Sequence, residues 1–304
     1  MPNLITHYYF SQIVKELLPQ DIRETIEKQR QAFILGAIGP DFLFALRELG
    51  MKEKKFPNVM QYLKVFEVFE SCGRYVKDNY DDITYSYLLG LLCHYVSDYH
   101  VHPFVNFFSE RALVKQLPIN QAIHIHALIE SAIDSHICEE KLNTPCNEFP
   151  AHITCRAPRR VKRTIGRLYE KVIGKIFGYD TKARRYVFSF NCTELFMKFS
   201  IDKKGRKKKF FDWLENKFGL KKKITGLIRP PEGYGRIDYM NRQKRQWLTV
   251  RNGSVFSDES VDELLERAAK EAVKYIKNYN AYVFEGGELD KKDFSVNYEG
   301  IKIY

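Results

Sequence analysis

The chain has 304 residues, of which 44% are hydrophobic and 29% charged, so it can bury a large core, and disorder of the whole chain is excluded. Its longest apolar run, residues 88–93, is far shorter than the roughly 20 residues of a membrane-spanning helix, which excludes such a helix. Residues 1–150 carry a net charge of −5 and residues 151–304 one of +16, which predicts different tasks for the two halves.

The cysteines and the N-terminus indicate the compartment. The first seven residues show no basic segment followed by an apolar run, so they do not resemble a secretory signal. The six cysteines are scattered without a CxxC pair, and we expect them to be free thiols. We therefore expect a cytoplasmic protein.

The pattern of residues 1–150, the acidic half of the chain, predicts a series of helices. Residues 6–37 read as two amphipathic helices with a break near Pro19, followed by a glycine and proline stop at residues 36–41. Residues 57–79 carry apolar side chains at helical spacing and predict a helix with one buried face. The next helix covers residues 83–101 and should end before Pro103, because the residue before a proline avoids the α region. A further helix is predicted over residues 119–141.

The basic half is also mostly helical in its pattern. Residues 158–200 look helical and basic, whereas residues 229–258 are rich in Gly, Pro and Asn and predict loops. A last helix over 259–280 opens with a capping box from Ser260 to Glu263. Strand signals are confined to the tail, residues 294–304. We therefore predict an all-α fold, with a helical domain over residues 1–200 and a basic, mostly helical C-terminal region over 201–304.

Histidines concentrate between positions 94 and 136, where six of the eight lie. His94 and Asp98 are four residues apart on a predicted helix, hence one turn apart and offset by roughly 40° around the axis. His102 lies one further turn along. His126 and Glu130 repeat the four-residue spacing on the next helix.

Imidazole and carboxylate groups are ligands that zinc prefers, and two helices that each turn such a pair inward can build a metal site within a bundle. A single HxxxD or HxxxE pair is more often an exposed polar pair. Two pairs on neighbouring helices with apolar faces favour the metal site. His100 and His124 fall on the opposite helix faces, and we expect neither to be a ligand.

These residues resemble a known family. The HxxxDxxxHP string of residues 94–103 is similar to the central helix of the zinc-dependent phospholipases C, in the branch of uncharacterised cytosolic members, and of their relatives, the S1/P1 nucleases. Residues 126–134 are similar to the family's HxxxExxxD helix. His7 matches its N-terminal histidine, and residues 39–41 match its Gly-Pro-Asp turn. The resemblance covers roughly residues 1–140 and implies a multi-helix phospholipase C/P1 nuclease-like bundle.

The resemblance also implies a ligand set for two or three zinc ions. His94 and Asp98 would hold the first zinc. His102, His126 and Glu130 would hold the second. His7 would hold a third, with Asp98 as a bridge.

Further roles follow from the same resemblance. Asp41 would be a metal partner or the catalytic general base, and Asp134 would orient His126 or a neighbour. The chain departs from the family at Gln61, where the family has a histidine; the Gln61 carbonyl oxygen is a weaker ligand and would weaken the first site.

The implied activity is zinc-dependent hydrolysis of a phosphodiester, with phospholipid headgroups as the leading substrate. Two alternatives remain: a nuclease of the S1/P1 type, and a non-catalytic metal-binding or membrane-docking protein whose site is degenerate at Gln61. The number of bound zinc ions discriminates best between an enzyme and the non-catalytic protein.

Residues 203–223 predict contact with polyanions. Phe210, Phe211, Leu214 and Phe218 share a helix face, Trp213 flanks it, and lysine clusters lie on both sides. Such a helix can lie on an anionic membrane surface. A helix packed on the domain with a solvated lysine face is the alternative, and nucleic acid is a less favoured partner.

Overall fold

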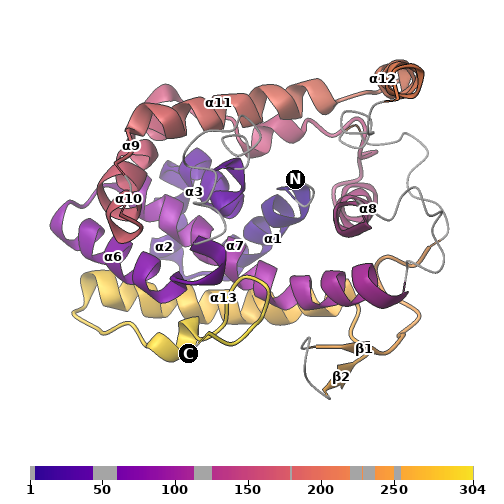
Figure 1. The fold of residues 1–304 in the computed structure, drawn as a ribbon. Coiled ribbons are helices and arrows are strands. Elements are labelled where there is room, and N and C mark those ends of the chain that lie inside the picture. The colour runs from indigo at the N-terminus through magenta and orange to yellow at the C-terminus, as the bar shows by residue number, and fades with distance from the viewer. Residues whose placement is uncertain are drawn as a thin grey trace.

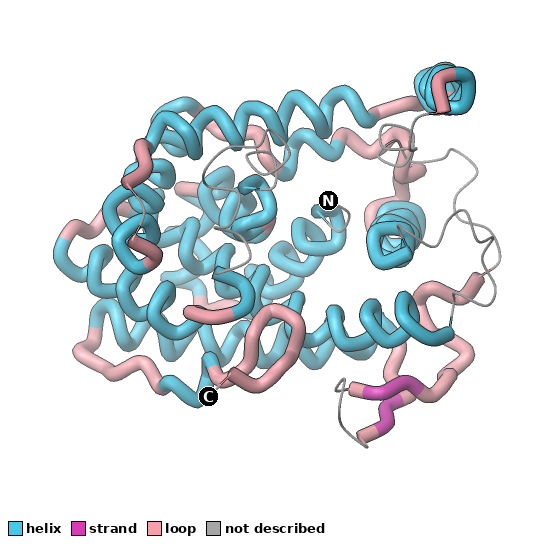
Figure 2. The backbone as a smooth tube through the Cα atoms, in the orientation of Figure 1, coloured by secondary structure: helices cyan, strands magenta, loops and turns pink. Residues whose placement is uncertain are grey.

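The structure is a computed structural model that describes residues 4–43, 60–112, 125–178, 180–219, 228, 237–249 and 255–303 (Figures 1 and 2). Nearly all regular structure in these ranges is helical. The strands found there are β1 (Trp247–Leu248) and β2 (Phe256–Ser257), which pair antiparallel. The prediction of an all-α multi-helix bundle is therefore confirmed.

Helix α7 (Asp82–Phe107) lies at the centre and is covered by α3 (Arg30–Ala37) and α13 (Val261–Phe284) (Figure 1). The approach of α3 to α7 requires glycine on both sides. A Cβ atom on Gly36 would lie 2.0 Å from the Tyr87 carbonyl oxygen, and one on Gly90 would lie 2.0 Å from the Phe33 carbonyl oxygen. The two backbones are thus in direct contact, which fixes the segment after α3 against α7.

The N-terminal segment forms three helices where the sequence predicted two. The break at Pro19 is confirmed, between α1 (Leu4–Leu17) and α2 (Gln20–Lys28). A second break falls at Gln29, whose φ of −124° and ψ of 38° separate α2 from α3. The two helices lie in different environments: α2 buries only Ile22 and Ile26, whereas six of the eight residues of α3 are buried.

The prediction that Pro103 ends its helix is wrong. Helix α7 begins after Asp81, whose carboxylate accepts from the Thr84 backbone N–H at 2.9 Å, and continues through Pro103 to Phe107. A π-turn, η3 (Phe108–Ala112), follows. Proline cannot donate to the carbonyl of Tyr99, four residues earlier. Gly300 of the C-terminal tail lies beside this turn, since a Cβ atom on Gly300 would lie 2.9 Å from the Tyr99 carbonyl oxygen and 2.7 Å from Cγ of Pro103.

The long terminal helix α13 packs in the same core as the N-terminal helices. Its predicted capping box is confirmed, and the helix extends four residues beyond the expected end at 280. The Tyr279 hydroxyl donates to the Phe69 carbonyl of α6 (Val65–Asp78) at 3.0 Å. Residues 57–59 of the predicted α6 region lie outside the described residues.

The remaining helices surround this core. They are α8 (Ile125–Glu140), η5 (Ala151–Thr154), α9 (Arg159–Leu168), η6 (Tyr169–Ile173), α10 (Gly174–Ile176), α11 (Ala183–Ser200), α12 (Arg206–Lys217) and η8 (Lys291–Phe294). Residues 119–124, at the predicted start of α8, are outside the described part of the chain. Within the described ranges no helix is long and apolar enough to cross a membrane.

The strand prediction was wrong in its location. Residues 294–303 form the end of η8, a turn and one isolated bridge between Val296 and Lys302. The two strands lie instead in the segment predicted as loop. The six cysteines are free thiols, as predicted.

Candidate metal centre

Four elements bring histidine and carboxylate side chains together beside α7. Helix α7 presents His94, Asp98 and His102 along one face over two turns. The other donors come from α1, from the 3-10 turn η1 (Gly39–Leu43) and from α8. They are His7 from α1, Asp41 from η1, and His126 and Glu130 from α8.

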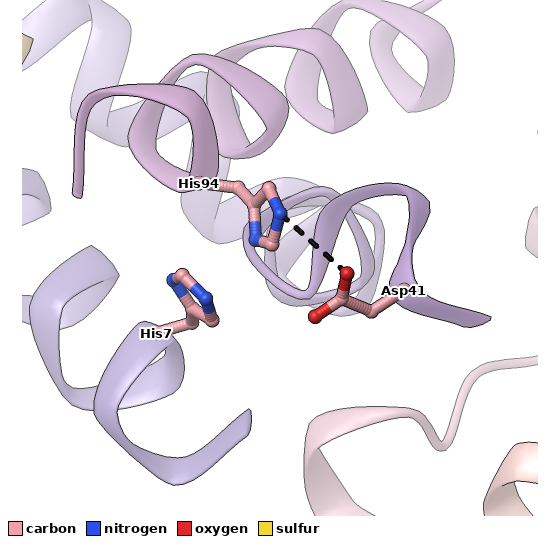
Figure 3. Close-up of side chains that lie close together, drawn as sticks. All are labelled: His7, Asp41 and His94. Atoms are coloured by element: carbon pink, nitrogen blue, oxygen red, sulfur yellow. Dashed lines mark ion pairs between the residues drawn. The ribbon is translucent and has the colours of Figure 1, made fainter. Parts of the chain in front are cut away.

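The first group of donors consists of His7, Asp41 and His94, whose ligand atoms all lie within 4.8 Å of one another. Figure 3 shows the three side chains turned toward a common space. Asp98 adjoins the group: its Oδ1 is 3.1 Å from Nε2 of His7 and its Oδ2 is 3.1 Å from Nε2 of His94. The structure thus places His7 and His94 together, although the family resemblance assigned them to different zinc ions.

Two atoms of this group are buried without a hydrogen bond. Nε2 of His94 and Oδ1 of Asp98 lie among the unsatisfied side-chain atoms, although each has an oppositely polar neighbour nearby. A buried polar atom without a partner costs about 1–3 kcal/mol. A cation held between the two groups would satisfy both atoms, so the donor set fits a zinc ion.

In His7 and His94 the Nδ1 atom, which faces away from the common space, forms a hydrogen bond. Nδ1 of His94 lies 3.1 Å from the Ala37 carbonyl, which can only accept, so Nδ1 carries the proton. The Ser97 hydroxyl donates to the His94 carbonyl at 3.0 Å and therefore accepts from Nδ1 of His7 at 2.8 Å. Both rings accordingly turn Nε2 toward the common space, as metal-binding histidines do.

The second group consists of His102, His126 and Glu130, again within 4.8 Å of one another. Oε1 of Glu130 lies 3.4 Å from Nε2 of His102 and 3.0 Å from Nε2 of His126. Asp98 links the groups, because its Oδ1 is also 3.6 Å from Nε2 of His102. The His126 side chain is 40% exposed, so this end of the centre faces solvent.

The carboxylates and histidines of the centre shift one another's pKa values. Burial lowers the pKa of His102, but the neighbouring Asp98 and Glu130 carboxylates raise it more, so that the pKa lies well above the usual value. Burial raises the pKa of Asp98, and the surrounding histidines, His102 first, hold it well below its usual value. Binding of a divalent cation would displace these protons, because histidine ligates in its neutral form.

Asp41 is held by the residue that departs from the family pattern. The Gln61 amide Nε2 donates to Oδ1 of Asp41 at 3.3 Å, and that oxygen lies 3.9 Å from Nε2 of His94. An amide nitrogen has no lone pair for a metal, so Gln61 in this orientation orients Asp41. Burial raises the pKa of Asp41, against the opposing effect of His94.

The structure places the remaining predicted residues away from the metal-facing atoms. Asp134 accepts from the Ile5 and Thr6 backbone N–H groups and from the Thr6 hydroxyl, so it holds the first turn of α1, which carries His7. Nε2 of His100 lies 2.7 Å from the Glu271 carboxylate of α13, on the other face of α7, and His100 belongs to neither donor group. His124 lies outside the described residues.

Several supporting residues were missed by sequence reasoning. Ser97 sits between two ligand candidates, and its position three residues after His94 was the available signal. The C-terminal tail gave no signal: the Tyr298 carbonyl lies 2.8 Å from Nδ1 of His102, and the Glu299 carboxylate lies 3.8 Å from the same nitrogen. No local motif marks these residues as part of the site.

Comparison with known proteins finds one family for the helical region that carries the two donor groups. A family model described as zinc dependent phospholipase C matches residues 6–186, which include every candidate ligand and extend past the motifs into α11. No similar protein was found among curated proteins, and no similar chain among solved structures.

Proposed function

Because the chain belongs to the zinc-dependent phospholipase C family, we propose that it is a phosphodiester hydrolase that cleaves the headgroup from phospholipids. The observation that carries the proposal is the pair of donor groups joined by Asp98, with two buried ligand atoms left without hydrogen bonds. In an ordinary structural ion pair the polar atoms satisfy each other, whereas Nε2 of His94 and Oδ1 of Asp98 have no hydrogen bond.

The residues divide the chemical tasks. His7 and His94, with Asp98 between them and Asp41 beside them, would hold one zinc ion. His102, His126 and Glu130 would hold another. When bound, zinc supplies Lewis-acid polarisation of a phosphoryl oxygen and lowers the pKa of water. In the proposed reaction water adds to phosphorus, the glycerol oxygen leaves, and that oxygen takes a proton.

Asp41 is the candidate general base. Its side chain is 13% exposed at the rim of the first group, and the Gln61 amide restricts its orientation. A carboxylate in this place can accept the proton of the attacking water, provided that it lies within hydrogen-bond reach of that water. Gln61 then positions the base and leaves the metal ligands to the histidines and Asp98.

Zinc stoichiometry combined with activity tests the proposal. The purified protein should hold at least two zinc ions, release diacylglycerol from phospholipid micelles, lose activity with a chelator and regain it with zinc. Asp41→Asn should lower the rate about 100-fold or more while His7, His94 and Asp98 still hold their zinc ion, because general-base catalysis contributes about 10²–10⁴-fold. His152→Gln, on η5 and in neither donor group, is the control.

The two alternatives are outcomes of the same experiment. Metal-dependent cleavage of single-stranded DNA without phospholipid hydrolysis would establish the nuclease. Fewer than two zinc ions, with cleavage of neither substrate, would establish a non-catalytic protein.

The surface formed by α11 and α12 supports phospholipid as the substrate. The most exposed apolar side chains of α12 are Phe210 and Trp213, with exposures of 55% and 54%, and Phe218, directly after the helix, is 63% exposed. Helix α11 adds exposed Phe188, Leu195 and Phe199, spaced along one stripe. The helices meet at one edge of the molecule, where the rings of Phe199 and Phe211 are 5.6 Å apart (Figure 1).

The charges of this surface have one sign. Every exposed charged residue of 203–219 is basic, namely Lys203, Lys204, Arg206, Lys207, Lys209 and Lys217. The acidic side chains of the segment are turned inward or half-buried, with Glu215 at 2% exposure. Aromatic side chains flanked by lysines match an anionic lipid surface, where rings enter the acyl boundary and ammonium groups contact phosphates.

Vesicle binding tests this surface separately from catalysis. The protein should sediment with vesicles containing anionic lipid, and salt should weaken the binding. The double variant Phe210→Glu, Trp213→Glu should stay in the supernatant while it hydrolyses a small soluble phosphodiester at the wild-type rate. Phe256→Glu, at a similarly exposed aromatic residue on β2, should bind as the wild type does. Equal sedimentation of the double variant would refute the docking surface.

A further inference from the structure

The C-terminal tail contacts the metal centre although it lies far from the histidine motifs in the sequence. Residues 296–300 form a turn whose Tyr298 carbonyl meets His102, 196 positions earlier. Tyr298 is 2% exposed, and its ring lies 5.0 Å from Tyr95 and 5.7 Å from His94. The tail therefore forms part of the wall of the centre.

The turn is organised by its own side chains. The Asn297 side-chain oxygen accepts from the backbone N–H groups of Glu299 and Ile301 at 2.9 and 3.0 Å. Gly300 has a φ of +72°, a conformation that glycine adopts without strain. Its backbone N–H donates to the Asn297 carbonyl at 2.9 Å. Asn297 thus holds the carbonyl of Tyr298 in a fixed direction.

The turn is also attached to the elements around the centre. The Tyr298 backbone N–H donates to the backbone carbonyl of Gln61 at 3.0 Å, and the Tyr95 hydroxyl donates to the backbone carbonyl of Val296 at 2.9 Å. The Glu299 carboxylate accepts from the Asn106 amide of α7. These contacts join the tail to α7 on both sides of His102.

The hydrogen bond between the Tyr298 carbonyl and His102 favours one tautomer of the His102 ring. A carbonyl only accepts, so Nδ1 at 2.8 Å must carry a proton. In the neutral ring Nε2 then holds the lone pair, and Nε2 faces Glu130 and Asp98. The negative charge of Glu299, 3.8 Å from Nδ1, favours the proton at that nitrogen and makes Nε2 a stronger metal ligand.

We propose that the C-terminal turn 297–300 is a positioning device for zinc at the His102, His126 and Glu130 group. The Tyr298 carbonyl orients His102, Glu299 strengthens it, and Asn297 keeps both in place. The inference rests on the zinc binding of the proposed function and adds residues that touch no metal themselves.

Zinc affinity and the His102 tautomer test the device together. Asn297→Ala should weaken one zinc site about 10–100-fold, as measured by competition with a chromophoric chelator. Asn297→Asp retains an acceptor for both N–H groups and should bind near wild-type affinity. Long-range proton–nitrogen correlation spectra of the histidine-labelled, zinc-free protein are recorded at a pH high enough to make the His102 ring neutral. They should show His102 protonated at Nδ1 in the wild type and Asn297→Asp, and both tautomers in Asn297→Ala.

Glu299→Gln provides a second test that leaves the turn closed. It should weaken the same site about 10-fold, whereas Glu288→Gln, an exposed acid elsewhere in the tail, should leave the affinity unchanged. If circular dichroism shows that Asn297→Ala does not fold, the zinc affinities of Glu299→Gln and Glu288→Gln test the inference on their own. If the Asn297→Ala and Glu299→Gln proteins fold and bind zinc within twofold of the wild-type affinity, this inference is wrong and the proposed function still stands. If the wild-type protein binds no zinc, the proposed function is wrong as well.

Discussion

The metal centre and the α11–α12 surface both depend on charged side chains, but they use them in opposite environments. At the centre Asp98 is 2% exposed and His94 is completely buried, and each has a defined set of neighbours. At the surface five of the six lysines of residues 203–217, all but the half-buried Lys208, are exposed and lie beside exposed aromatic rings. Removal of a buried charge leaves its partners uncompensated, whereas water and salt screen an exposed one. Substitutions in the two regions should therefore differ in both size and kind of effect.

The largest effect is expected at the carboxylate that joins the two donor groups. Asp98→Asn removes the charge shared by His7, His94 and His102 and should weaken zinc binding more than 100-fold, because even the loss of an outer partner costs about 10–100-fold. Elemental analysis after gel filtration measures the zinc. His100→Gln, two residues away on the opposite face of α7, should retain the metal; equal zinc in the two variants would contradict the assignment.

The next effect concerns the frame that holds the centre. Gly36→Ala would place a Cβ atom 2.0 Å from the Tyr87 carbonyl, so α3 must separate from α7, at a cost of about 3 kcal/mol or more in the free energy of unfolding. Gly286→Ala meets no neighbour within 4 Å, and its φ of +75° should cost about 1 kcal/mol. Chemical denaturation of both variants compares the two costs. A smaller loss in Gly36→Ala than in Gly286→Ala would show that the helices adjust freely.

Proton competition should give the centre a pH dependence that the surface lacks. In the metal-free protein burial lowers the pKa of His102, but Asp98 and the other nearby carboxylates raise it more, so the ring is still protonated above the usual histidine range. Zinc must displace that proton, and its affinity should rise with pH through and beyond about 6.5. Titrations at several pH values should show up to about a tenfold gain per unit for each proton released. A flat profile would mean that zinc binds elsewhere.

The smallest effect on stability is expected at the surface. Lys204→Glu with Lys209→Glu changes two exposed groups and should alter the free energy of unfolding by less than about 0.5 kcal/mol for each. Vesicle binding should nevertheless weaken about 10-fold or more, because each lysine near an anionic membrane contributes about 1 kcal/mol. Sedimentation and thermal unfolding of one preparation separate the two results. A large loss of stability with unchanged sedimentation would reverse the comparison.

Local patterns in the sequence determined the helices and the main ligand candidates. The four-residue spacing of His94, Asp98 and His102 predicted that they share one helix face, and His126 with Glu130 repeated the spacing. The capping box at Ser260 was equally readable. Such features depend on residues within two turns of one another, and helical geometry fixes their relation.

Only the tertiary structure decided how these pieces combine. It placed His7 with Asp41 and His94, continued α7 through Pro103 beside Gly300 of the tail, and brought Tyr298 and Glu299 to His102. It also placed the strands in the segment predicted as loop. Each of these features joins residues far apart in the chain, and their association is set by the packing of whole helices around α7. Periodicity describes the face of one helix; it does not describe which distant segment will cover that face.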